Sequence, residues 1–200
     1  MNSTNFSAAV SAKPASPTSA RVSGESSMWF FIIGDLFIFG AYFVSYIYYR
    51  GQDPQLFLGG QQHLNQWIGV VNTIVLLTSS LFVALAAEGA RSGNRTTALR
   101  MLTIACALGV MFPVLKMIEW LPKLDAGLTP GESLFFMYYY LMTGLHLVHV
   151  ILGLIILGFV FRELKTAKHP NIGFVETGAV YWHMVDLLWL LLFALFYLMR

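Results

Sequence analysis

Five long apolar runs occupy nearly all of the sequence after residue 27: residues 28–49, 67–87, 98–121, 134–161 and 177–199. An α-helix rises about 1.5 Å per residue and the hydrocarbon core of a bilayer is about 30 Å thick, so about 20 apolar residues suffice to cross it. Only 11% of the 200 residues are charged, whereas a soluble domain carries about 25%. The sequence therefore predicts an all-α, polytopic membrane protein, a bundle of five transmembrane helices.

The segments between the runs are short, and they span residues 51–66, 88–97, 122–133 and 162–176. Short connections force consecutive helices to run antiparallel. None of them is large enough to form a second domain, so we predict one five-helix membrane domain over residues 28–200. Residues 1–27 are rich in Ser, Ala, Thr and Pro and contain no apolar run. Such a segment cannot bury enough surface to order itself, so we expect a flexible N-terminal tail.

The positive charges predict an orientation. With five crossings, the N-terminal tail and the second and fourth connections lie on one side of the membrane. That side has eight Lys or Arg residues, against four at most on the other. The eight are Lys13, Arg21, Arg91, Arg95, Arg100, Arg162, Lys165 and Lys168, and the four are Arg50, Lys116, Lys123 and Arg200. The positive-inside rule then places the N-terminus in the cytoplasm and the C-terminus outside, in a bacterium the periplasm. The net charge of +2 gives no reason to expect nucleic-acid binding.

Polar side chains inside the apolar runs are the candidate functional residues, because lipid cannot hydrogen-bond them. Asp35 in the first run is either a proton-exchanging carboxyl or a structural acid, which the protein hydrogen-bonds or which lies near the lipid headgroups. Lys116 and Glu119 are three residues apart, so they share a helix face and we expect them to pair. Ala105 and Gly109 form a small-residue surface that should admit a neighbouring helix.

The fourth and fifth runs each carry a pair of polar residues at i, i+3 spacing. His146 and His149 lie in the fourth run, and His183 and Asp186 lie in the fifth. One interpretation is a metal site made by all four side chains. The other is a polar cluster in which the imidazoles and the carboxylate satisfy each other across helices, and the pattern favours this second interpretation.

Residues 143–153 (TGLHLVHVILG), 161–165 (FRELK) and 181–189 (YWHMVDLLW) together resemble two helices, and the segment joining them, of subunit III of haem–copper oxidases. Residues 72–80 (NTIVLLTSS) and Glu119-Trp120 also fit, and the likeness covers about residues 28–200. The resemblance implies an accessory subunit that packs beside a catalytic haem–copper subunit. It would hold no cofactor or metal of its own, with haem and copper in the partner subunits.

The resemblance also implies phospholipid bound in a cleft between helices and support of proton uptake. Arg162 matches the family's lipid-headgroup arginine, although a plain positive-inside charge explains it equally well. Six residues form the predicted intramembrane proton or polar cluster: Asp35, Glu119, His146, His149, His183 and Asp186. The sequence agrees with an accessory role, because only three histidines and one cysteine, Cys106, lie in the apolar runs.

One departure from the family pattern concerns the first run. Asp35 stands where the family usually has Glu, and residues 34–39 (GDLFIF) look like a five-helix subgroup associated with nitric oxide reductases. We therefore predict a component of an electron-transport complex in a bacterial inner membrane, reducing either oxygen or nitric oxide.

Two other functions remain open from the sequence. One is a stand-alone proton or solute carrier with Asp35, Glu119 and Asp186 as its relay. The other is a self-contained haem protein that uses His146 and His149.

Overall fold

The computed structural model describes residues 26–199, with side chains from Met28 onward. This part of the chain forms six α-helices and a short closing π-helical turn, without β-strands. The elements are α1 (Ser26–Gln52), α2 (Pro54–Gln62), α3 (Gln66–Arg91), α4 (Arg95–Asp125), α5 (Leu134–Thr166), α6 (Ile172–Phe193) and η1 (Ala194–Leu198). Most of the predicted flexible tail, residues 1–25, lies outside the described residues, and α1 begins at Ser26.

Five of these helices, namely α1, α3, α4, α5 and α6, are long and apolar enough to cross a membrane. Their outward faces carry large apolar side chains, and Phe30, Phe37 and Trp67 are each about four-fifths exposed, at 80%, 79% and 79%. A continuous apolar surface of this kind suits contact with lipid rather than water. The prediction of an all-α fold with five spanning helices is confirmed.

Each α-helix from α2 to α6 begins after a residue whose side chain caps it. The capping oxygen accepts a hydrogen bond from a backbone N–H of the first turn, which would otherwise lack a partner. The caps are Asp53, Asn65, Asn94, Ser133 and Asn171. Gly93 and Gly127, with φ of 74° and 80°, make the tight turns that follow α3 and α4. Local sequence therefore determines where these helices begin and where α3 and α4 end.

The first connection differs from expectation. Residues 51–66 are a short connection between two apolar runs, but they contain a further helix, α2, which has Asp53 at its N-cap and Pro54 at its first position. Its nine residues are too few and too polar to register as an apolar run. The spanning helices are also longer than the apolar runs, so the last connections shrink to residues 126–133 and 167–171.

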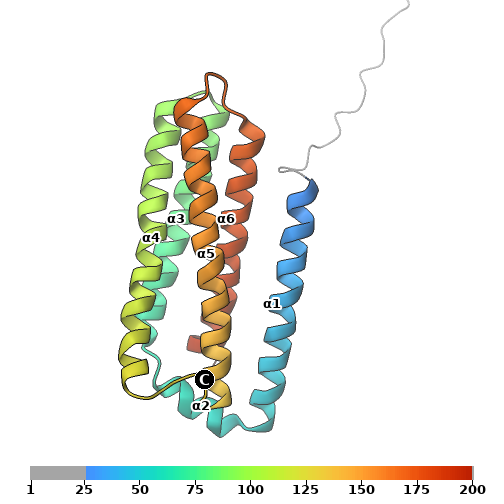
Figure 1. Ribbon diagram of the computed structural model, residues 1–200, viewed down its shortest axis with the longest axis vertical. Coiled ribbons are helices and arrows are strands. Elements are labelled where there is room, and N and C mark those ends of the chain that lie inside the picture. The colour runs from blue at the N-terminus through green and yellow to red at the C-terminus, as the bar shows by residue number, and fades with distance from the viewer. Residues whose placement is uncertain (1–25, 200) are drawn as a thin grey trace, which may run out of the picture.

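Helices α3, α4, α5 and α6 form a ring in which each packs against two others, and α1 packs mainly against α6. Figure 1 shows α1 standing at one edge of this ring, beside α6, with α2 at the end where α1 stops. The polar residues of interest lie either inside the four-helix ring or at its seam with α1.

Glycines let the ring close tightly around Trp182, which is 1% exposed. A Cβ at Gly109 of α4 would come within 2.8 Å of the Trp182 ring, and a Cβ at Gly153 of α5 within 2.9 Å. On the same side of α4, Ser79 of α3 donates a hydrogen bond to the Ala105 carbonyl, at 2.8 Å. The expected close approach of a neighbouring helix at Ala105 and Gly109 is confirmed.

The C-terminal end of the bundle is held by one side chain from α2. The Gln61 amide nitrogen, which is buried, donates to the carbonyls of Leu195, Phe196 and Met199, at 3.3, 3.2 and 2.8 Å. These carbonyls belong to the last turns of the chain, where helical partners run out. Gln61 therefore fixes η1, and with it the position of Tyr197.

Candidate functional site

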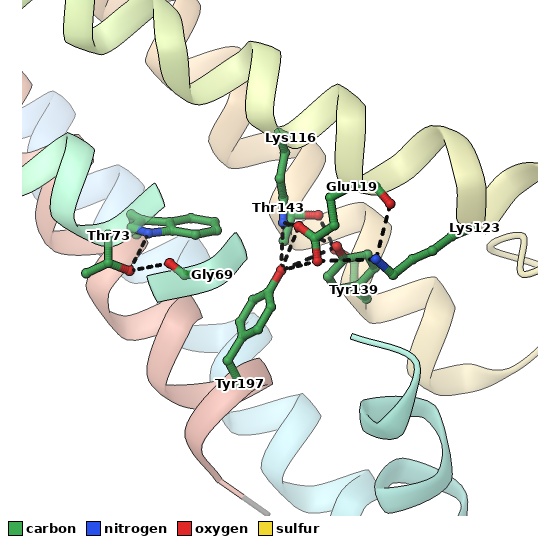
Figure 2. Close-up of polar contacts among 9 residues, drawn as sticks. Gly69, Thr73, Lys116, Glu119, Lys123, Tyr139, Thr143 and Tyr197 are labelled. Carbon is green, nitrogen blue, oxygen red and sulfur yellow. Dashed lines mark hydrogen bonds and ion pairs between the residues drawn. The ribbon is translucent and has the colours of Figure 1, made fainter. Parts of the chain in front are cut away.

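The most connected polar group in the described chain is the Glu119 carboxylate of α4. Its Oε2 accepts from the Lys116 ammonium at 2.8 Å, and its Oε1 accepts from the Lys123 ammonium at 3.3 Å. The Tyr197 hydroxyl donates to the same carboxylate, 2.7 Å from Oε1. Lys116 also donates to the hydroxyls of Tyr139 and Tyr197, at 3.2 and 3.0 Å. Figure 2 shows these side chains converging from α4, α5 and η1. We call these five residues the Glu119 cluster.

Burial makes the Glu119 cluster energetically demanding. Lys116 is 0% exposed, Glu119 2% and Lys123 8%. Burying a charge without partners costs several kcal/mol. A buried charge is therefore tolerated only when other groups pair with it in good geometry. Lys116 meets that need with three acceptors, one for each N–H, and its ammonium lies 5.0 Å from the ring centre of Trp189. The expected Lys116–Glu119 pair is confirmed.

Asp35 lies at the seam between α1 and the ring. Its Oδ2 is 3.3 Å from His149 Nε2, and both side chains are mostly covered. The other ring nitrogen, Nδ1, is 2.8 Å from the Leu145 carbonyl. A carbonyl only accepts, so Nδ1 carries a hydrogen and Nε2 faces the carboxyl. The contact is an ion pair when the imidazole is protonated, and Oδ2 makes no hydrogen bond among the described residues.

His146 occupies a different environment, although it is only three residues from His149. Its ring is 0% exposed and lies between Phe112 of α4 and Trp189 of α6, with ring centres 5.4 Å away in both cases. Neither ring nitrogen has a hydrogen-bond partner among the described residues. Asn72 of α3 is likewise fully buried with its amide unpartnered there. Ordered water commonly satisfies such groups in proteins.

His183 and Asp186 lie along the seam between α6 and α3. His183 Nδ1 is 2.5 Å from the Ser80 hydroxyl of α3, and the Asp186 carboxyl interacts with that same hydroxyl. Asp186 is 8% exposed, whereas His183 is exposed. One turn further along the seam, the Trp189 indole donates to the Thr73 hydroxyl at 3.0 Å. The α3–α6 seam thus carries a short series of side-chain hydrogen bonds.

The four residues predicted to satisfy one another do not form a single cluster. His149 pairs with Asp35, His183 with Ser80, and His146 packs among aromatic rings. Residues at i, i+3 are about 60° apart around a helix, so in a crowded bundle they reach different neighbours. Within residues 26–199, no three His, Cys, Asp or Glu side chains are placed to share a metal ion.

Arg162 lies one turn before the C-terminal end of α5 and is exposed. Other groups at this end of the bundle are tied together. Arg91 of α3 pairs with Glu176 of α6 at 2.7 Å, and the Arg95 guanidinium donates to the Lys165 carbonyl. Arg162 therefore remains free to meet a group outside the described chain.

Sequence reasoning missed part of the Glu119 cluster. Lys123 could have been found, because it lies four residues after Glu119 on the same helix face. Tyr139 and Tyr197 are distant in sequence by 20 residues or more, and nothing local marks them as partners of Glu119. Both sit in aromatic-rich segments that read simply as apolar core.

The family to which these features belong follows from comparison with known sequences. The family model described as cytochrome c oxidase subunit III matches residues 18–200. The chain belongs to the cytochrome c oxidase subunit III family. The resemblance to subunit III of haem–copper oxidases is confirmed, and the chain is a multi-pass membrane protein.

Individual relatives agree with the family assignment. The chain is 34% identical over 180 residues to cytochrome c oxidase subunit 3 of Prototheca wickerhamii, covering 85% of this chain and 67% of the relative. It is 31% identical over 172 residues to that of Synechocystis, covering 84% and 72%. It is also 30% identical over 182 residues to a haem–copper oxidase subunit I+III of Aeropyrum pernix, covering 87% and 22%. The chain thus spans about two thirds of these subunit 3 relatives and about a fifth of the I+III protein.

The charge arrangement in the Glu119 cluster predicts an order of stabilities. Glu119→Gln leaves two buried ammonium groups without a carboxylate and should lower the free energy of unfolding by about 3–5 kcal/mol. Lys116→Met leaves a balanced Lys123–Glu119 pair and should cost less. Thermal unfolding of the detergent-purified protein, followed by fluorescence-detected size exclusion, measures both.

The matched control for this order is Glu132→Gln, which removes an exposed carboxylate and should leave the unfolding temperature unchanged. Equal losses from Glu119→Gln and Lys116→Met would contradict the order, and so would an unfolding temperature that neither variant moves.

Proposed function

We propose that this protein is a non-catalytic subunit III-type component of a bacterial haem–copper respiratory complex. It stabilises the catalytic subunit, binds membrane lipid and assists proton supply, and it holds no cofactor of its own. Haem and copper reside in the partner subunits. The observation that carries this proposal is the family match over residues 18–200, supported by a relative whose name joins subunits I and III.

The stabilising role is supported by how the interior polar groups are used. The Glu119 cluster joins α4, α5 and η1, and the Ser80, Thr73 and Ser79 hydroxyls join α3 to α6 and α4. Interhelical hydrogen bonds of this kind fix the positions of membrane helices relative to one another. A bundle fastened in this way offers a rigid surface to a larger neighbour.

The proton-supply role is assigned to Asp35 and His149. The Asp35 carboxyl lies 3.3 Å from His149 Nε2, while His149 Nδ1 contacts the Leu145 carbonyl. The seam with α1 covers most of both side chains and leaves 13% and 11% exposed. A carboxyl and an imidazole at an edge of the bundle can exchange a proton with a group on an adjoining protein.

Lipid binding is assigned to Arg162, whose exposed guanidinium can form charge-assisted hydrogen bonds to a headgroup phosphate. The excess of positive residues at this end of the bundle supports an orientation with this end and the N-terminus on the cytoplasmic side of a bacterial inner membrane, and the C-terminus in the periplasm.

The electron acceptor of the complex is either oxygen or nitric oxide. The run at residues 34–39, with Asp35 in place of the family's Glu, favours the nitric oxide branch and therefore a place in denitrification. The relatives named above carry oxidase names, which favours aerobic respiration. Consumption of each gas by the purified complex decides between the two branches.

The proposal predicts that the tagged protein, purified from native membranes in mild detergent, brings a haem-containing catalytic subunit with it. Haem absorbance in the eluate, with identification of the partner by mass spectrometry, measures this. A chain that is recovered clean and colourless from several mild detergents contradicts the proposal. Haem held by the chain after its partners have been removed contradicts the non-catalytic role.

The Asp35→Asn variant separates proton supply from assembly. The substitution keeps the size of the side chain, but the amide that replaces the carboxyl cannot take up or release a proton. We expect the recovered haem per chain to stay at the wild-type level while turnover of the complex falls. Loss of the variant from the membrane would make Asp35 a structural residue, and unchanged turnover would remove it from the proton route.

A further inference from the structure

His183 is an exposed imidazole inside a membrane span. Along the helix axis it lies about 9 Å from the start of the apolar run at residue 177 and about 22 Å from the end of η1. The hydrocarbon core is about 30 Å thick, so the ring lies within it. A ring nitrogen at this depth must find a protein partner or remain unsatisfied.

Within the described residues, only half of the imidazole's hydrogen-bonding capacity is used. Nδ1 is held by the hydroxyl of Ser80, a residue that is 8% exposed. Because Nδ1 is engaged on α3 and the side chain is exposed, Nε2 is the ring nitrogen left for a group outside the chain. Nothing else in residues 26–199 hydrogen-bonds it.

The surroundings of the ring are apolar. Leu77 and Ala84 lie three and four residues from Ser80, on the same face of α3, and Leu187 lies four residues after His183, on the same face of α6. Leu77 is 46% exposed, Leu187 49%, and Ala84 is also exposed. We call these three residues together with His183 the His183 face. One hydrogen-bonding group framed by small and large apolar side chains is typical of the centre of a protein interface.

We propose that the His183 face is the docking surface for the catalytic haem–copper subunit, which presents a hydrogen-bonding group to His183 Nε2. This inference rests on the proposed function. Acyl chains have no group that could pair with the imidazole, so lipid is a poor occupant. The relative that joins subunit I to subunit III in one polypeptide favours a catalytic subunit over a second copy of this chain. The α1 edge is a separate surface, since α1 reaches α6 through a Phe31–Tyr181 ring contact.

The test places the photo-reactive residue p-benzoylphenylalanine at Leu187 in the full complex, in native membranes. The matched control is the same residue at Ile151 on α5, which is 47% exposed against 49% for Leu187 and equally far from the same end of the bundle. We expect irradiation to join the Leu187 variant to the haem-bearing subunit, identified by mass spectrometry, and the Ile151 variant to lipid alone. Crosslinks from Leu187 to a second copy, or to lipid alone, overturn the docking surface.

A second variant pair tests the imidazole itself. His183→Leu makes the face wholly apolar, and we expect about threefold to tenfold less haem recovered per chain after detergent challenge. His183→Gln keeps a hydrogen-bonding group near the position of Nε2 and should restore recovery. Wild-type recovery from His183→Leu overturns the role of the ring. If the unsubstituted chain recovers no haem subunit, the proposed function is wrong. If it recovers the haem subunit but only the Ile151 variant crosslinks to it, the proposed function stands and the His183 face is not the docking surface.

Discussion

The pairing of one buried carboxylate holds this structure together. Glu119 is surrounded by two ammonium groups and a tyrosine hydroxyl, and it is almost wholly removed from solvent and lipid. In a bilayer the apolar surfaces of helices gain little by meeting each other, because lipid tails are equally apolar. Specific helix positions therefore depend on contacts that lipid cannot replace. The Glu119 cluster provides one at the end of the ring, where α4, α5 and the C-terminal turn meet.

The other polar contacts of the bundle follow from the same constraint but serve different surfaces. Glycines at 109 and 153 bring α4 and α5 onto Trp182, and hydroxyls on α3 meet α4 and α6. The Asp35–His149 contact lies outside this ring and joins it to α1. The four-helix ring is thus fastened internally. The seam with α1, which carries Asp35 and His149, and the exposed side of α6 at His183 carry the groups that can act on a neighbouring protein. A fastened core with polar groups at its edges suits a subunit that supports a neighbouring redox protein.

Much of this could be predicted from sequence, because the signals are local. Span number follows from the lengths of the apolar runs, the Lys116–Glu119 pair from helical spacing, and the close approach at Gly109 from small residues. The caps Asn65, Asn94 and Asn171 are also local signals for helix starts. Pairings between helices could not be predicted in the same way. The histidines at 146 and 149 share a motif, yet one meets aromatic rings and the other Asp35, because rotation within the bundle separates them.

The most direct test of the account is a double-mutant cycle between Glu119→Gln and Tyr197→Phe. These two residues join α4 to η1 through the hydrogen bond from the Tyr197 hydroxyl to the Glu119 carboxylate. The quantity measured is the free energy of unfolding of the wild type, both single variants and the double variant in one detergent. If the Glu119 cluster fastens the ring, the coupling energy is about 1–3 kcal/mol. A coupling below about 0.3 kcal/mol would mean that the two residues act independently, and the fastening role of Glu119 would be wrong.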